Sequence, residues 1–176
     1  MKETIAKDPD FFSTVDYHEA ADLDGAQCCL GSGSDERGTG YFGSVVKRDG
    51  DITGVFNGDG YNGGREAMIA AIRSGGNRLD AYAIDNSTGE PGRLARTYAK
   101  LGFEPVARVP FNAEYAAPGV KPQDIVFYKH NGDSADKVAA NYGKYPPPTK
   151  SQYDALPVMD YDSAIEFRDN QIKNKR

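Results

Sequence analysis

Short apolar runs, separated by glycine-rich and polar segments, are the main pattern in this sequence. Alternating or continuous apolar positions predict strands at residues 26–30, 41–47, 52–56, 79–84, 103–111 and 125–129. Apolar positions at helical spacing predict helices over residues 65–74 and from near Pro91 to Leu101. Gly75 and Gly102 directly follow these helices, where a left-handed cap is common. The order of elements predicts an α/β fold.

Two local patterns predict how these elements connect. Asp49-Gly50 lies between the strands 41–47 and 52–56 and predicts a tight hairpin turn. The strand 52–56, the helix 65–74 and the strand 79–84 form a strand–helix–strand unit, which predicts a right-handed crossover between two parallel strands. Glycine and serine at 31–38 predict a flexible loop.

The character of the sequence changes after Gly132. We therefore predict one domain over residues 1–132 and an appendage over residues 133–176. The appendage is expected to contain a short helix at 134–142, a stiff spacer at Pro146-Pro147-Pro148 and a terminal helix at 163–173. It is expected either to dock on the domain or to bind a partner.

Charge and composition exclude several classes of protein. The net charge is −5 and no basic stripe is present, which argues against a nucleic-acid partner. No signal peptide and no long apolar run are present, so a cytoplasmic protein without a membrane partner is expected. Cys28 and Cys29 are neighbours and are expected to be reduced and buried in a strand. No Cys/His set has metal-site spacing, so no metal is predicted.

The glycine-rich segment before the helix 65–74 is the strongest candidate site. Glycines at 58, 60, 63 and 64 precede a helix start, whose unpaired amides and positive dipole end favour an anion. Residues 57–65 are therefore a candidate pyrophosphate cradle, with Arg65 adding a positive charge. The alternative is a mobile turn with no ligand, and the segment alone does not separate the two.

The next part of the chain resembles a known family. Tyr98-Ala99-Lys100-Leu101-Gly102-Phe103 is similar to the Tyr-x-Lys-x-Gly-Phe pattern at the end of a helix in the GCN5-related N-acetyltransferase (GNAT) superfamily. The strand 79–84 precedes this helix, and a strand follows Phe103, as in that family. Residues 107–115 and 124–127 resemble a GNAT-like subgroup associated with phages and prophages. The resemblance covers residues 40–130.

The resemblance implies a fold, a cofactor and an activity. The fold would be a mixed, mostly antiparallel twisted sheet flanked by helices, with the C-terminal appendage outside it. The cofactor would be acetyl-coenzyme A (acetyl-CoA), and the acetyl group would pass to an amine acceptor, for instance one on a protein. The reaction would take place in the host cytoplasm if the chain is phage-encoded. Tyr98 would protonate the departing thiolate. The implied cofactor-binding residues are Thr53, Val55, Phe56, Asn57, Gly58, Gly60, Gly63, Gly64 and Arg65.

The chain also departs from the family pattern. Gly60 stands where the family has Gln or Arg, and Arg65 stands where it has a small residue. Pro91 stands near the position of the family's Asn. Tyr98 shares an apolar helical face with Leu94 and Leu101, so packing in the core is an alternative to catalysis. Two other functions therefore stay open: a non-catalytic phage protein that binds a host or virion protein, and a coenzyme-A-binding regulator without transfer activity.

Overall fold

The computed structural model describes residues 23–58, 60–112, 114 and 123–174. These residues form a mixed α/β protein with two antiparallel sheets. The chain divides into two compact units. The first unit ends at Asn77 and also takes in Ser134–Asp136, and the second unit comprises Arg78–Asp133 together with the residues from Lys137 onward.

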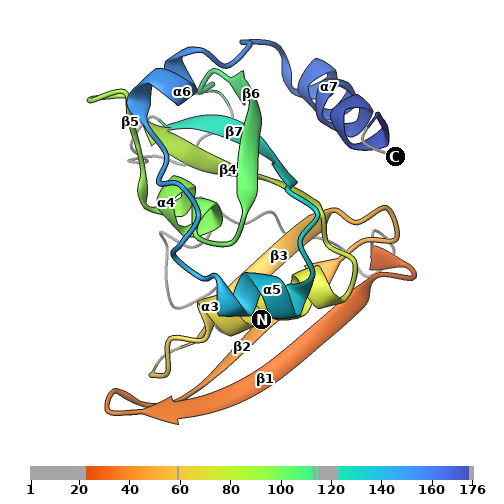
Figure 1. The fold of residues 1–176 in the computed structure, drawn as a ribbon, viewed down its shortest axis with the longest axis vertical. Helices are drawn as coiled ribbons and strands as arrows, with labels where there is room; N and C mark the ends of the chain where they lie inside the picture. Colours follow the sequence, from red (N-terminus) through yellow and green to blue (C-terminus); the bar gives the residue numbers. More distant parts are fainter. Residues whose placement is uncertain (1–22, 59, 113, 115–122, 175–176) are drawn as a thin grey trace. The chain divides into compact units, whose positions relative to one another are not determined.

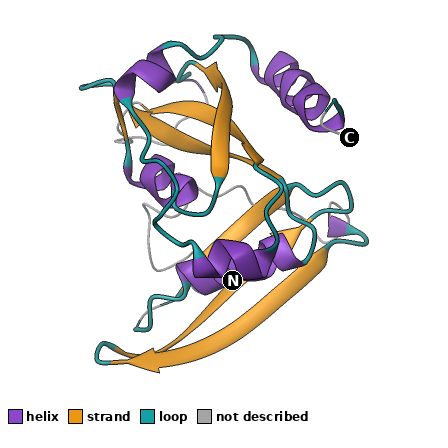
Figure 2. Ribbon diagram, viewed as in Figure 1, coloured by secondary structure: helices purple, strands orange, loops and turns teal. Residues whose placement is uncertain are grey.

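The first unit is a three-stranded sheet covered by one helix. The strands β1 (Gln27–Asp35), β2 (Gly38–Val46) and β3 (Ile52–Asn57) pair antiparallel in the order β1-β2-β3. The helix α3 (Gly64–Arg73) packs on β2, β3 and β1 (Figures 1 and 2). Its buried residues are Ala67, Met68, Ala71 and Ile72, as the apolar spacing predicts.

The second unit is built on a four-stranded antiparallel sheet. Its strands are β4 (Arg78–Asp85), β5 (Glu90–Pro91), β6 (Phe103–Val109) and β7 (Gln123–His130), in the order β5-β4-β7-β6. The helix α4 (Arg93–Ala99) and the helix α7 (Tyr161–Lys173) lie on opposite faces of this sheet (Figure 1). Tyr128 and Phe127 on β7 illustrate this, because successive side chains of a strand point to opposite faces. Tyr128 meets Tyr98 of α4, and Phe127 meets Tyr161 of α7.

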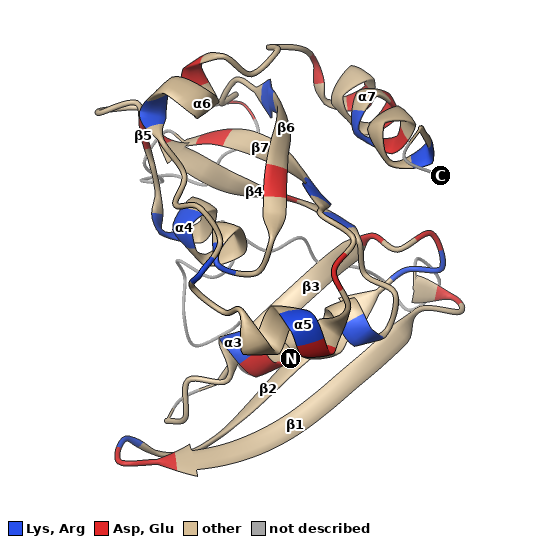
Figure 3. Ribbon diagram, viewed as in Figure 1, with Lys and Arg blue, Asp and Glu red and all other residues tan. Residues whose placement is uncertain are grey.

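The residues after 133 include three helices, each with at least one buried side chain. The helix α5 (Ala135–Ala140) has its first two residues assigned to the first unit and the others to the second. The helix α6 (Lys150–Asp154) was not predicted. The predicted terminal helix is confirmed as α7. Ala164 of α7 is fully buried in a core cluster with Val106, Ala107 and Phe127. Among the helices described, none has the length and apolar character needed to cross a bilayer. The strands of the first unit carry one charged residue, Asp35, whereas the strands of the second unit carry both acidic and basic residues (Figure 3).

Most predicted strands are confirmed, but the predicted single sheet and its parallel pair are wrong. The hairpin around Gly50 is present, with φ of 90° at that glycine. However, β3 and β4 belong to different sheets instead of pairing parallel. The chain after β4 turns back, so that Glu90–Pro91 pairs with Ile84 and Asp85. Strand β5 therefore forms the backbone hydrogen bonds at the C-terminal end of β4 that a parallel partner such as β3 would have formed there.

Three further predictions need correction. The predicted loop at 31–38 is mostly strand: β1 continues to Asp35 and β2 begins at Gly38. Cross-strand pairing supports this extension, since the hydroxyls of Ser34 and Thr39 lie 2.7 Å apart. Cys28 and Cys29 are free thiols, but neither is buried as predicted. Cys28 is exposed, because strand alternation places it on the face opposite α3, and Cys29 is half-buried. The second helix begins near Pro91, as predicted, but ends at Ala99 and not at Leu101.

Candidate functional site

The candidate anion site is the glycine-rich turn that connects β3 to α3 in the first unit. The predicted helix is confirmed, and Gly63 is its N-cap residue, without a side-chain cap. Ala67 is the first helical residue whose amide bonds to a preceding carbonyl, that of Gly63, at 2.9 Å. Helix geometry directs the amides before Ala67 out of the N-terminus. All the predicted cofactor-binding residues lie in β3, this turn or the first turn of α3.

The turn is held by hydrogen bonds from the chain itself. The Asn57 side-chain oxygen accepts a 2.7 Å hydrogen bond from the Gly63 amide. The Asn57 side-chain amide donates to the Asn62 side-chain oxygen at 3.4 Å. The Gly58 amide donates to the Tyr41 carbonyl at 2.8 Å. Asn57 therefore occupies one amide that a bound diphosphate would otherwise use.

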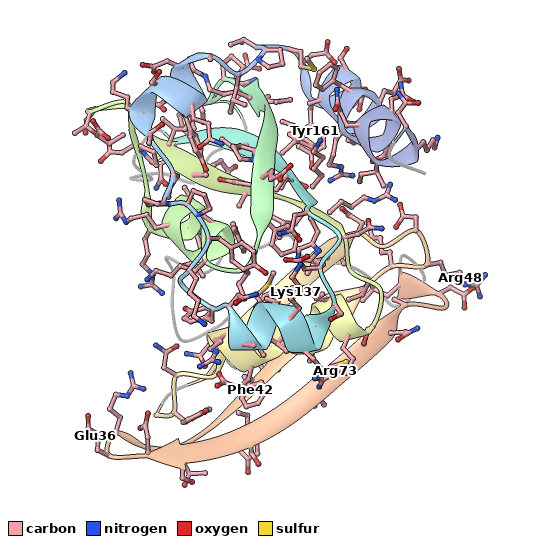
Figure 4. All side chains as sticks on the ribbon, in the orientation of Figure 1. Glu36, Phe42, Arg48, Arg73, Lys137 and Tyr161 are labelled. Carbon is pink, nitrogen blue, oxygen red and sulfur yellow. The ribbon has the colours of Figure 1, made fainter. Side chains whose placement is uncertain are left out.

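Packing explains two of the glycines in the turn. A Cβ on Gly63 would lie 2.1 Å from the ring of Phe42, which projects from β2 and is labelled in Figure 4. Gly60 has φ of 91°, and a Cβ there would lie 2.6 Å from the Thr39 carbonyl oxygen. Both positions require glycine for close approach of the chain to itself.

Gly64 differs from these two glycines. A Cβ on Gly64 would have the Asn62 side-chain oxygen, at 3.8 Å, as its nearest neighbour. Space beside the first turn of α3 is therefore open at this position. The charges nearby are mixed: Arg65 favours an anion, whereas Glu66 opposes one. Burial raises the pKa of the Tyr61 hydroxyl, and the negative charge of Glu66 raises it further.

The strand that leads into the turn contains a β-bulge. Val45 pairs with Gly54 and Val46 pairs with Ile52, so Thr53 has no counterpart on β2. A bulge bends a strand and changes the direction of its groups, and bulges are common beside binding sites. Val55 and Phe56 are half-buried on either side of this strand. The predicted pantetheine-binding segment is therefore an irregular strand.

Tyr98, the predicted proton donor, lies on α4 in the second unit and is half-buried. Its ring packs against Phe103, with centroids 6.1 Å apart, and against Tyr128, with centroids 5.5 Å apart. Burial raises the pKa of Tyr98 to about 12, and the charge of Asp80 contributes. The phenol is therefore protonated near neutral pH. Proton transfer to a thiolate with a pKa of about 8.5 is less favourable from this phenol than from an unperturbed one.

The sequence did not single out Asp124, a buried carboxylate at the start of β7 that is 7% exposed. Its Oδ1 accepts hydrogen bonds from the Asn86 side chain at 2.8 Å and from the Phe111 amide at 2.9 Å. Its Oδ2 lies 3.1 Å from Nε of Arg108. These contacts use both oxygens and hold three strand ends together, so we assign Asp124 a structural role. A single acid before an apolar run carried no signal of this role.

Over the described residues, no three Asp, Glu, His or Cys side chains gather closely enough to hold a metal ion. Comparison of the chain with protein-family models, with curated proteins and with solved structures finds no match in any of the three.

Proposed function

We propose that the chain is an acetyl-CoA-dependent N-acetyltransferase of the GNAT type, with an amine as the acceptor. The observation that supports it best is the connection from a bulged strand, through a glycine-rich turn, to the open N-terminus of α3 at Gly64. A helix N-terminus carries about +0.5 of an elementary charge and favours a phosphate. The Tyr98–Phe103 sequence resemblance supplies the reaction class.

In this proposal the chain's residues bind the cofactor and donate a proton. The amides at the start of α3, with Arg65, hold the diphosphate. The backbone of β3 around the bulge at Thr53 pairs with the pantetheine arm. Tyr98 donates the proton to the departing thiolate. When bound, acetyl-CoA would supply an acetyl thioester: the bond from the amine nitrogen to the acetyl carbon would form as the carbon–sulfur bond breaks. The proton that the amine loses would pass through solvent and replace the one that Tyr98 gives to the thiolate.

Gly64→Asp tests the proposal at the diphosphate. The substitution places a negative charge in the first helical turn, where it favours the helix but repels a phosphate. Calorimetric titration with acetyl-CoA should show binding to the unchanged protein and at least a tenfold loss in Gly64→Asp. Gly64→Asn is the matched neutral control and should lose less. Equal affinity in all three proteins, or no binding to the unchanged protein, would overturn the proposal.

Tyr98→Phe tests the chemistry separately from binding. It removes the hydroxyl and keeps the ring contacts with Phe103 and Tyr128. Transfer to an amine acceptor should fall at least tenfold, while acetyl-CoA affinity stays the same. Unchanged transfer would exclude Tyr98 as the proton donor.

A second candidate function is a non-catalytic binding protein. The observation that favours it is that Asn57 and the ring of Phe42 already fill part of the turn. This candidate predicts no protection of the protein against thermal unfolding by acetyl-CoA. The same titration therefore separates the two functions.

A further inference from the structure

A cavity in the second unit is lined by residues other than those assigned to the proposed cofactor site, and Tyr98 is not among them. Its volume is about 490 Å³, which is within the range of roughly 300–1,000 Å³ typical of sites for small molecules. Strands β6 and β7, the segment 145–153 and helix α7 surround it. The lining residues used below include Glu104, Lys129, Tyr145, Phe167 and Gln171.

The cavity has one cationic side chain, that of Lys129, which is only 12% exposed. The side-chain oxygen of Gln171 lies 3.5 Å from its amine, at the outer limit of a hydrogen bond. The nearest carboxylate oxygen, on Glu104, lies 3.9 Å away and is beyond hydrogen-bond distance. A largely buried ammonium has three donors and is costly without close acceptors. Lys129 is therefore suited to receive an acceptor from a ligand.

The remaining walls restrict the chemistry of that ligand. Tyr145 and Phe167, with Pro146 and Pro148, provide apolar and aromatic surface, and Asn131, Gln152 and Gln171 add polar groups. One ammonium matches one carboxylate through a short charge-assisted hydrogen bond. The Glu104 side chain is 48% exposed and adds a negative charge at the cavity, which disfavours dianions such as a phosphate ester.

We propose that this cavity binds a small monocarboxylic acid with an apolar body. The carboxylate bonds to Lys129, and the apolar body packs against the aromatic and proline side chains. This site shares no residue with the acetyl-CoA proposal, because neither the glycine-rich turn nor Tyr98 contributes to its lining.

Titration of the full chain with phenylacetate, followed by calorimetry, tests the proposal. Phenylacetamide is the matched neutral probe of nearly the same shape. We expect saturable binding of phenylacetate and at least tenfold weaker binding of phenylacetamide. Absence of saturable binding, or equal binding of the two probes, would overturn the proposal without any variant. Acetyl-CoA binding is measured in a separate titration, so failure of one proposal leaves the other unaffected.

Two variants then locate the site. Lys129→Met keeps the length of the side chain and removes the charge, and it should weaken phenylacetate binding at least tenfold. Glu104→Gln removes the competing negative charge and should tighten binding several-fold. Unchanged affinity in a folded Lys129→Met protein would place the bound acid elsewhere and refute the assignment. If Lys129→Met does not fold, weaker or unchanged binding in Glu104→Gln refutes it instead.

Discussion

The hydroxyl groups of Tyr128 and Tyr153 lie 2.9 Å apart in the interior of the second unit. Tyr128 is on β7 and Tyr153 is on α6, and the two residues are 0% and 1% exposed. This buried hydrogen bond therefore connects helix α6 to strand β7 in the sheet of the second unit, and neither tyrosine is accessible to water.

Tyr153→Phe should destabilise the protein by about 1–3 kcal/mol, because it leaves the buried Tyr128 hydroxyl without its partner. The double variant Tyr128→Phe/Tyr153→Phe should cost less than the sum of the two single variants, since neither hydroxyl remains to be satisfied. Urea unfolding of the four proteins measures this coupling. Strict additivity would show that the two hydroxyls do not interact.

Gly63 and Gly64 are neighbours with opposite expected responses to alanine. Gly63→Ala forces a Cβ to within 2.1 Å of the Phe42 ring, so a loss of about 1–3 kcal/mol of stability is expected. Gly64→Ala meets no atom closer than 3.8 Å and should stabilise α3 by about 0.5–1 kcal/mol. The thermal stability of the Gly63→Ala and Gly64→Ala proteins, compared with that of the unchanged protein, tests this packing of the turn. The same loss in both variants would contradict it.

The Asp169 carboxylate on α7 lies 2.9 Å from Nη1 of Arg78 on β4. Asp169 also accepts from Nε of Arg168 at 3.1 Å, and Arg168 is 3% exposed and lies 5.4 Å from the centre of the Phe127 ring. Asp169→Asn should therefore cost about 2 kcal/mol, because hydrogen bonds to charged groups are lost.

Helix α7 should be the first element affected in Asp169→Asn. Hydrogen exchange of the α7 amides is the measurement, with Glu166→Gln as the control because Glu166 is exposed on the same helix. Tyr161, labelled in Figure 4, donates to Asp80 at 3.1 Å and holds the start of α7 in both proteins. Equal exchange in the two variants would show that Asp169 does not anchor the helix.

The buried ring of His130 predicts a pH dependence of stability. Its Nε2 lies 3.1 Å from the Leu101 carbonyl, and its Nδ1 accepts from the Gly132 amide at 3.3 Å. Burial lowers the pKa of His130, although the Leu101 bond and the charges of Asp133 and Glu104 oppose this. The unfolded chain then binds a proton more readily than the folded protein.

The contribution of neutral His130 to the free energy of unfolding is therefore fully present above the pKa of histidine in the unfolded chain, about 6.5. It is lost as the pH falls toward the lower pKa of His130 in the folded protein. The free energy of unfolding should change with pH by at most about 1.4 kcal/mol per pH unit through this one group. Urea unfolding between pH 5 and pH 7.5 measures it. His130→Phe should flatten the curve in this window, and His18→Gln, at the chain's other histidine, should leave the His130 part of the slope in place. A flat curve in the unchanged protein would contradict the prediction.

The pattern of apolar and turn residues within short stretches of the sequence was sufficient to predict most of the secondary structure. The apolar spacing at 65–74 predicted α3, and the glycine at 75, with φ of 90°, ends it as a left-handed cap. The hairpin at Asp49-Gly50 followed from turn chemistry between neighbouring residues. These features depend on residues a few positions apart, so their physical causes are contained in a short window of sequence.

The candidate site was predicted in part. The position of the turn before α3 was correct, but the sequence did not show that Gly63 faces Phe42 or that Asn57 bonds to its amide. The contact between Gly63 and Phe42 joins the turn before α3 to strand β2, about twenty residues earlier in the chain. A glycine run has the same appearance whether it accommodates a ligand or the protein's own ring.

The sequence by itself determined which segments become strands and helices, because hydrophobic period and turn residues act locally. Tertiary structure alone decided that the strands form two sheets, that Asp124 is buried among Asn86, Arg108 and Phe111, and that Lys129 lines a cavity. Each of these depends on which distant segments pair and pack, and strand period does not specify a strand's partner. The free energy of burying and pairing whole elements makes that choice.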